Sequence, residues 1–177
     1  MSENVASPSP SQDGVGTPDS ASAHQRILIA SDHAGVALKG RLSAVLAELG
    51  YEVADLGPSD DASVDYADYA HPLAEQVAAG SAKRGVLLCG TGLGMSYTAN
   101  RHAGVRAAVA WSPEIAALAR QHNDSNVLVL PARFVSDAEG EAILRRWLDE
   151  PFEGGRHERR VAKIELPRPG AASGDTQ

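Results

Sequence analysis

The sequence predicts an α/β protein, a three-layer α/β/α sandwich built on a five-stranded parallel sheet. Short runs of Val, Ile, Leu and Ala alternate along the chain with longer segments of helical periodicity. The short runs are mostly aliphatic, as is typical of strands whose two faces are both covered. Glycine or proline separates many of these segments. This alternation indicates a doubly wound, Rossmann-like sheet with helices on both faces.

Five segments are expected to be strands because each is short and rich in aliphatic residues. Gly57 and Pro58 end the second of them, and the third runs directly into a glycine-rich loop. The predicted strands cover residues 27–30, 51–56, 85–89, 105–111 and 126–130.

The segments between the strands carry helix signals. The first has one apolar face and stops at Gly50, a residue suited to a helix end. Ser112 is followed by a proline and a glutamate, which indicates a helix start. Ser136 and Glu139 form a capping-box pattern. The predicted helices cover residues 38–49, 68–79, 95–101, a segment that follows residue 112, 136–149 and about 155–165.

Length and composition limit the possible classes of function. The chain has 177 residues and a net charge of −7, which argues against general affinity for nucleic acids or acidic membranes. The single cysteine rules out an internal disulfide. No apolar stretch approaches the roughly 20 residues needed to span a bilayer. Residues 1–24 lack the features of a secretory signal, so we expect a cytoplasmic protein.

The two ends of the chain differ in composition from its centre. Residues 1–24 and 166–177 have too little apolar content to offset the entropy cost of ordering, so we expect both to be disordered. Residues 25–165 are the predicted folded domain.

The most informative segment is GVLLCGTGLG, residues 85–94. Cys89 ends a predicted strand, and Gly90, Gly92 and Gly94 follow at alternate positions, so that backbone N–H groups can approach a ligand closely. Two interpretations of Cys89 remain open at this point. It is either a reactive thiol beside an anion-binding loop or a small apolar residue at the end of a buried strand.

The residues of this loop exclude three familiar loop types, two of them through Met95. It occupies the third glycine position of the dinucleotide fingerprint G-x-G-x-x-G and the arginine position of a thiol phosphatase loop. The loop also lacks the Gly-Lys-Ser/Thr end of a nucleotide-binding P-loop. What remains is a glycine-lined anion site without a nucleotide signature.

Further polar groups lie where a parallel sheet binds ligands, beyond the carboxyl ends of its strands. Asp32 and His33 follow the first predicted strand directly, although Asp32 is equally suited to capping the next helix. The corner at Trp111 is expected to face the same crevice as Asp32 and Cys89.

A second set of polar residues lies later in the chain. His122 and Asn123 end a predicted helix, where a histidine is favoured by the helix dipole alone. Arg156 and Arg160 are spaced to share one helix face, and their mutual repulsion is relieved by a bound phosphate or by solvent. Arg133, just past the fifth strand, is expected to join them.

Five motifs together resemble ribose-5-phosphate isomerase type B, whose wider family includes galactose-6-phosphate isomerase. They are SDHAG (31–35), DYADYA (65–70), CGTGLGMSYTAN (89–100), RQHNDSNVLVL (120–130) and GGRHERRV (154–161). The resemblance implies a homodimer or tetramer, without metal or cofactor, that has its active sites at the subunit interface. It also implies interconversion of ribose 5-phosphate and ribulose 5-phosphate through a cis-enediolate, a step of the pentose phosphate pathway.

The same resemblance implies roles for individual residues. Cys89 would be the base, because Met95 stands where some relatives carry a catalytic glutamate. Thr91 and His122 would assist ring opening, and Asp32 would hold sugar hydroxyls. The loop would bind the enediolate oxygen, and other residues would bind phosphate or line the substrate site. The loop residues are Gly90, Gly92, Leu93 and Gly94, and the lining residues are Tyr66 and Asn123. The phosphate ligands are His33, Arg133, Arg156 and Arg160. The last two would reach the site of a neighbouring subunit.

One residue departs from the family pattern, and two other functions remain open. Ala67 stands where the family usually has proline, which is expected to loosen that loop. A six-carbon sugar-phosphate isomerase, acting on allose or galactose 6-phosphate, is one alternative. A non-catalytic module that binds a sugar phosphate or nucleotide is the other.

Overall fold

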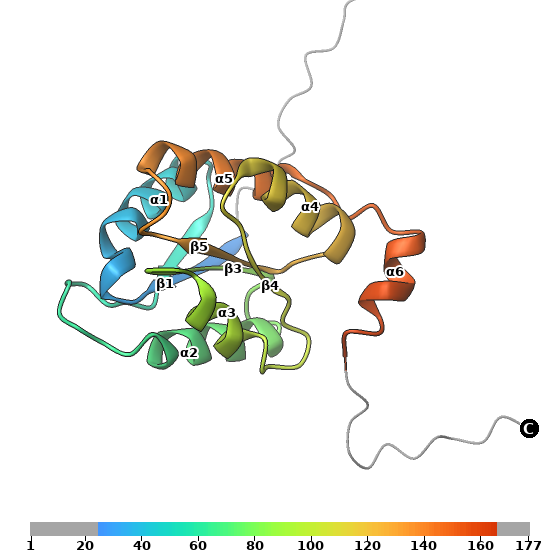
Figure 1. Ribbon diagram of the computed structural model, residues 1–177, viewed down its shortest axis with the longest axis horizontal. Helices are drawn as coiled ribbons and strands as arrows, with labels where there is room; N and C mark the ends of the chain where they lie inside the picture. The colour runs from blue at the N-terminus through green and yellow to red at the C-terminus, as the bar shows by residue number, and fades with distance from the viewer. Residues whose placement is uncertain (1–24, 166–177) are drawn as a thin grey trace, which may run out of the picture.

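The computed structural model describes residues 25–165 and confirms the predicted α/β architecture (Figure 1). The expected terminal extensions, residues 1–24 and 166–177, lie outside the described residues. Among the helices described, none is long and apolar enough to cross a membrane. In chain order the elements are β1 (Arg26–Ser31), the 3-10 turn η1 (His33–Gly35), α1 (Val36–Glu48), β2 (Glu52–Asp55), α2 (Tyr66–Ala78), β3 (Arg84–Cys89), α3 (Leu93–Ala99), β4 (Ala107–Val109), α4 (Pro113–Asn123), β5 (Val127–Pro131), α5 (Asp137–Asp149) and α6 (Arg156–Val161).

The five strands form one sheet in the order β2-β1-β3-β5-β4, and every neighbouring pair is parallel. From β1 the chain moves to β2 on one side and then crosses to β3 on the other, so the winding direction reverses between β1 and β3. The register places Ser31 opposite Leu88. The N–H of Asp32 then donates to the carbonyl oxygen of Leu88 at 3.0 Å. Residues that follow β1 and β3 therefore meet at the topological switch point.

Alternate strand residues face two separate cores. Ile27 and Ile29 of β1 belong to the core beneath α1, α4 and α5, whereas Leu28 and Ala30 belong to the core beneath α2 and α3. Figure 1 shows these two helix layers on opposite sides of the sheet. Because both of their faces are covered, β1, β3 and β5 are apolar at almost every position, whereas the edge strand β2 is partly exposed and carries two acidic residues.

The predicted helix signals are confirmed. The Ser112 hydroxyl accepts a hydrogen bond from the N–H of Ile115, and Ser136 and Glu139 form a complete capping box. Hydrogen bonds donated by the Ser136 backbone and hydroxyl lower the pKa of the Glu139 carboxyl. Gly50, just past α1, has a φ of 85°, which favours glycine.

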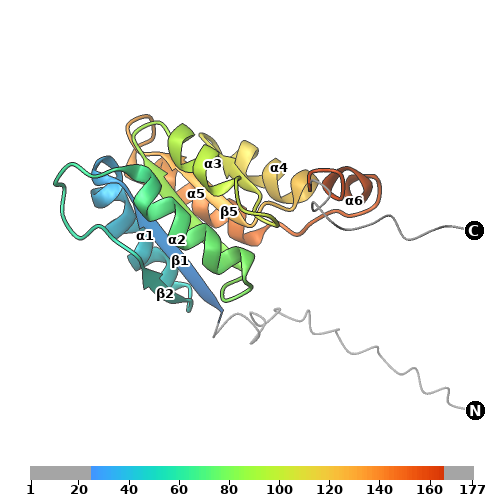
Figure 2. The ribbon, with the colours of Figure 1, turned by 90° about the horizontal axis from the view of Figure 1, so that it is seen from below.

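Some boundaries differ from the prediction. β4 covers only 107–109 because it is an edge strand that pairs with β5 alone. α3 begins at Leu93, ahead of Met95, and therefore includes Gly94. α6 ends at Val161 instead of 165. It packs mainly against α4 and extends beyond the body of the domain (Figure 2), so little apolar surface is available to lengthen it.

We expect Gly35→Ala to destabilise the domain. A Cβ at Gly35 would lie 2.8 Å from the Cβ of Leu88 and 2.9 Å from the Cβ of Ser31, two atoms fixed by paired strands. Overpacking of this kind lowers the free energy of unfolding by about 1–3 kcal/mol, measured by urea denaturation. Gly40→Ala is the matched control, because this exposed position in α1 is open. It should raise stability by about 0.5–1 kcal/mol. Equal effects of the two substitutions would contradict the role of close packing at Gly35.

Candidate active site

Cys89 is the last residue of β3 and is 4% exposed. Its Sγ accepts a hydrogen bond from the N–H of Gly92 at 3.1 Å. Gly92 has a φ of 76°, a conformation that residues with side chains rarely adopt. A backbone donor aimed at sulfur supports negative charge there, as a base or nucleophile requires. Cys89 also belongs to the core beneath α2 and α3, so its two proposed interpretations are not exclusive.

A cavity of about 260 Å³ opens beside Cys89 at the switch point. Asp32 and His33 line it from the β1 side. The Asp32 carboxylate accepts a hydrogen bond from the N–H of Ala34 at 2.9 Å, so it also performs the capping role that the sequence left open. His33 Nδ1 accepts a hydrogen bond from the N–H of Val64 at 3.3 Å. The ring proton of His33 therefore resides on Nε2, which makes that nitrogen a donor for an anionic ligand.

Two glycines make room for the larger side chains of this cavity. A Cβ at Gly94 would lie 2.7 Å from Cζ of Tyr66, and one at Gly90 would lie 3.3 Å from Cδ and Nε of Arg133. The N–H of Arg133 donates to the carbonyl oxygen of Gly90 at 3.1 Å, which holds the turn after β5 against the loop. The cavity is lined by Asp32, His33, Ala34, Tyr66, Cys89, Gly90, Thr91, Gly94 and Arg133.

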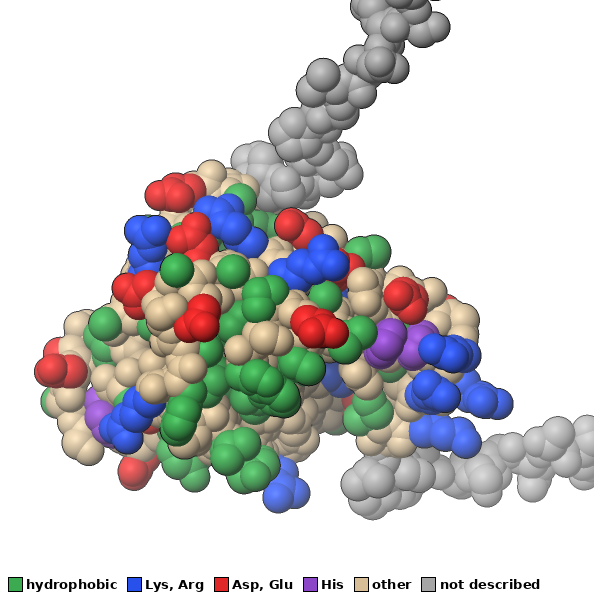
Figure 3. Space-filling model, turned by 45° about the horizontal axis from the view of Figure 1, so that its top comes forward, with side chains coloured by type: hydrophobic (Ala, Val, Ile, Leu, Met, Phe, Trp, Pro, Cys, Tyr) green, Lys and Arg blue, Asp and Glu red, His purple; other side chains and the backbone are tan. Residues whose placement is uncertain are grey.

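An apolar cavity of about 560 Å³ lies beside the first and shares Thr91 with it. Its lining includes Leu93, Trp111 and Phe134, of which Trp111 is 61% exposed and Phe134 71% exposed. Trp111 therefore faces a neighbouring hollow and not the Cys89 cavity itself, which corrects the expectation for this corner. Figure 3 shows hydrophobic side chains gathered on one face of the molecule. Exposed apolar surfaces of this kind mark interaction sites.

The remaining predicted site residues lie elsewhere in the chain. His122 and Asn123 are at the end of α4, and Arg156 and Arg160 are on α6. None of these four lines the Cys89 cavity within one chain. Lys and Arg side chains gather at the end of the molecule where α6 lies (Figure 3). The predicted site is thus divided between two separate groups in a single chain.

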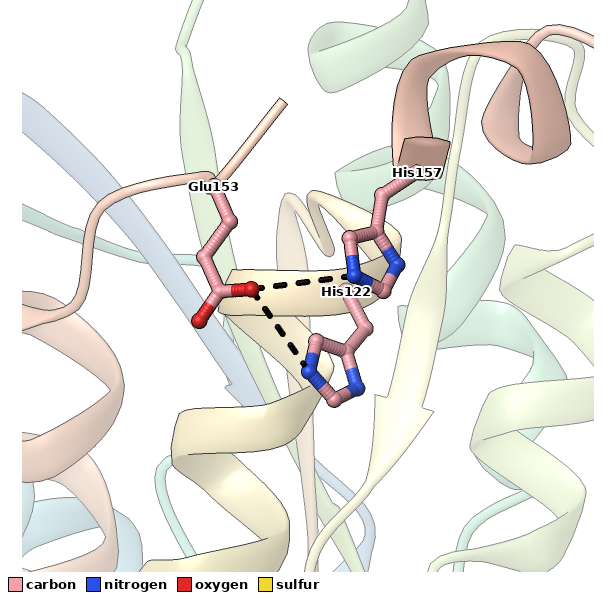
Figure 4. A group of neighbouring side chains, drawn as sticks. All are labelled: His122, Glu153 and His157. Carbon is pink, nitrogen blue, oxygen red and sulfur yellow. Dashed lines mark ion pairs between the residues drawn. The ribbon is translucent and has the colours of Figure 1, made fainter. Parts of the chain in front are cut away.

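The second group contains a cluster of His122, Glu153 and His157 (Figure 4), called the histidine cluster below. Oε2 of Glu153 lies 3.8 Å from Nε2 of His122 and 3.6 Å from Nε2 of His157. The two imidazoles stack, with ring centroids 4.3 Å apart and planes inclined by 4°. Sequence reasoning did not single out Glu153. Its only signal is an acidic residue just ahead of a basic segment, and nothing local predicts that it meets His122.

Comparison with known proteins identifies the family. The family model described as Ribose/Galactose Isomerase matches residues 27–164. The ribose-5-phosphate isomerase B of Escherichia coli is 44% identical over 140 residues, covering 79% of this chain and 94% of that protein. A probable ribose-5-phosphate isomerase B of Mycoplasma genitalium is 49% identical over 140 residues, covering 78% and 92% of the two chains.

Solved structures agree with this assignment. A ribose 5-phosphate isomerase from Thermotoga maritima is 48% identical, with a TM-score of 0.78, and the match covers 80% of this chain and 97% of that one. The Mycoplasma genitalium enzyme, solved with bound ribulose-5-phosphate, is also 48% identical, with a TM-score of 0.76 and coverage of 78% and 93%. The chain therefore belongs to the ribose/galactose isomerase family.

Proposed function

We propose that this chain is an aldose–ketose isomerase that interconverts ribose 5-phosphate and ribulose 5-phosphate. The observation that carries the proposal is the cavity at the switch point, where the Cys89 thiol meets the Asp32 carboxylate and the cationic Arg133. The Mycoplasma genitalium relative, solved with bound ribulose-5-phosphate, supports the choice of substrate.

Cys89 is the base in this proposal. Its thiolate removes the proton from C2 of the open-chain aldose, and the electrons of that C–H bond form a C1–C2 double bond while O1 becomes negatively charged. The thiol then returns the proton to C1, and a second proton passes from O2 to O1, which gives the ketose. Backbone N–H groups of loop 90–94 would stabilise the enediolate oxygen, whose charge develops mainly in the transition state. Asp32 would hold the sugar hydroxyls.

The phosphate provides an anchor remote from the reacting carbons. His33 and Arg133 already lie at the Cys89 cavity. Arg156 and Arg160 would supply further guanidinium groups, each of which can donate two hydrogen bonds to two oxygens of one phosphate. An anchored phosphate fixes C1 and C2 against the thiol and so lowers the entropy cost of proton transfer. These steps use only proton transfers and hydrogen bonds, so no metal ion or organic cofactor takes part in them.

We further propose that two copies pair so that α6 of one copy faces the Cys89 cavity of the other, as a dimer or within a tetramer. The division of the site residues between two places in one chain supports this pairing. The exposed apolar cavity at Trp111 and Phe134, which shares Thr91 with the Cys89 cavity, supplies a surface for it. His122 and Thr91 would then meet across the interface to open the sugar ring. Because sugar phosphates are charged and do not cross membranes freely, we propose a cytoplasmic location.

The purified chain is expected to isomerise ribose 5-phosphate, and Cys89→Ala is expected to abolish the reaction because in the proposal the thiolate carries the proton between C2 and C1. The affinity for a non-reactive sugar phosphonate should stay nearly unchanged in this variant, measured by calorimetry, because the phosphate ligands remain. Full activity of Cys89→Ala would remove the thiol from the mechanism.

Two further measurements belong to the same assay. Faster turnover of allose 6-phosphate than of ribose 5-phosphate would assign the chain to six-carbon sugars instead. Loss of activity on addition of a chelator, restored by a divalent metal, would contradict the metal-free mechanism.

Arg160→Ala is expected to raise KM for ribose 5-phosphate about tenfold or more, because a hydrogen bond between charged groups is lost. The turnover number should change less, since Arg160 touches no reacting atom in the proposal. Arg159→Ala, on the same short helix and equally exposed, is the matched control and should leave KM unchanged. Equal effects of the two substitutions in steady-state assays would contradict a specific phosphate contact.

A mixture of Cys89→Ala and His122→Ala chains is expected to regain activity that neither variant has alone. In each mixed dimer one of the two sites combines an intact Cys89 with an intact His122. Random pairing should therefore restore about a quarter of the wild-type activity. The measurement is activity after the two proteins are unfolded and refolded together. If the mixture stays inactive although both chains assemble, the site does not span two copies.

A further inference from the structure

The histidine cluster joins three segments of the chain. His122 ends α4, Glu153 lies in the connection after α5, and His157 lies in the first turn of α6. The side chain of His157 is 6% exposed, whereas those of His122 and Glu153 are 36% and 50% exposed. In Figure 4 both imidazoles turn one nitrogen toward the same Glu153 oxygen. The His122 ring therefore stacks on one member of the cluster and faces the carboxylate of the other.

The two imidazoles are not equivalent. Burial lowers the pKa of His157, and the nearby His122 and Arg156 lower it further, so this ring stays neutral. Nε of Arg156 donates to Nε2 of His157 at 3.3 Å, which requires a lone pair on that nitrogen. His157 therefore has no Nε2 proton to offer Glu153. His122 is more exposed and its Nε2 faces the Glu153 carboxylate, so His122 is the ring of the pair that can turn an N–H toward Glu153.

Other charged groups around the pair do not change this assignment. Arg156 and Arg160 of α6 act on His157 with the same sign, since both disfavour its protonation. Glu150, at the end of α5, is engaged by Arg146 and by the side-chain amide of Gln121. Glu153 is thus the carboxylate nearest to His122 among the described residues.

The same three side chains could be mistaken for a metal site, because their ligating atoms all lie within 4.8 Å of one another. The ring planes argue against this interpretation. A nitrogen lone pair lies in the plane of its imidazole, so two rings that share a metal ion must have planes that converge on it. Rings inclined by only 4° and stacked at 4.3 Å have parallel lone pairs that do not converge.

We propose that Glu153 and His157 are positioning residues for His122, with the Glu153 carboxylate facing its Nε2 edge at 3.8 Å and His157 fixing the plane of its ring. The inference rests on the proposed function, in which His122 opens the sugar ring. In that step the C1 hydroxyl loses its proton as the C1–O4 bond breaks and C1 becomes a carbonyl, while O4 gains a proton. A single imidazole can accept the first proton and donate the second. Nδ1 of His122, which points away from Glu153 in Figure 4, is the nitrogen left free for this exchange.

The test uses the full-length chain and ribose 5-phosphate with and without deuterium at C2. Glu153→Gln should lower kcat/KM about fivefold, the size expected for a half-exposed ion pair. The primary isotope effect should fall toward unity, because ring opening precedes C2–H cleavage and would become the slow step. Glu158→Gln is the matched control, an exposed glutamate on α6. It should change neither quantity.

A second pair of variants separates stacking from proton chemistry at His157. His157→Phe keeps a flat ring against His122 and should retain kcat/KM within about twofold. His157→Ala removes the ring and should lower both kcat/KM and the isotope effect. Thermal unfolding of each variant reports whether the fold is intact.

Three results would overturn the proposal. A loss of kcat/KM with an unchanged or larger isotope effect would mean that Glu153 and His157 act on phosphate binding or on the fold, and not on His122. Zn²⁺ binding that either substitution abolishes, together with loss of wild-type activity on chelation, would assign the cluster to a metal. Absence of isomerase activity from the unsubstituted chain would instead overturn the proposed function, and this inference with it.

Discussion

The pairing of β1 with β3 is the constraint on which the candidate site depends. Ser31 lies opposite Leu88 in this register, so the carboxyl ends of β1 and β3 are aligned. Asp32, the residue after β1, therefore lies at the edge of the sheet beside Cys89. Both strands are buried on two faces, and a slip by one residue would exchange the two cores. Gly35 packs closely against both strands and so helps to keep their carboxyl ends aligned. The positions of the thiol and the carboxylate are therefore set by the core rather than by the loops that carry them.

Much of this arrangement could be predicted from local patterns. Largely aliphatic strands indicated a doubly covered sheet, and the rule that ligands bind beyond the carboxyl ends of parallel strands placed Asp32 and Cys89 together from the sequence alone. Caps at Ser112 and Ser136 were equally local. The need for glycine at position 94, inside α3, was not predictable. The ring of Tyr66 leaves no room for a Cβ there, and Tyr66 approaches from a distant segment of the chain. The meeting of His122 with Glu153 escaped prediction for the same reason. The roles assigned to these residues stay predictions.

If the proposed pairing holds, the division of the site between two places in one chain couples catalysis to assembly. In the proposed dimer, the surface that buries Trp111 and Phe134 also completes the site, because Thr91 borders both cavities. Apolar contact would then supply most of the association energy, while the polar groups of α6 would supply specificity. Any ligand that bridges the two halves would stabilise the assembled form by mass action.

The position of α6 has a consequence for motion. This helix is six residues long, packs mainly against the end of α4, and exposes both Arg156 and Arg160. Segments with few buried apolar contacts open locally at far lower free energy than the whole domain. The sheet and the Cys89 loop, by contrast, are anchored in two continuous cores. The helix that would carry the phosphate ligands can thus detach and reseat while Cys89 and Asp32 stay in place, which would provide a route for product release without unfolding the edge of the sheet that carries the thiol.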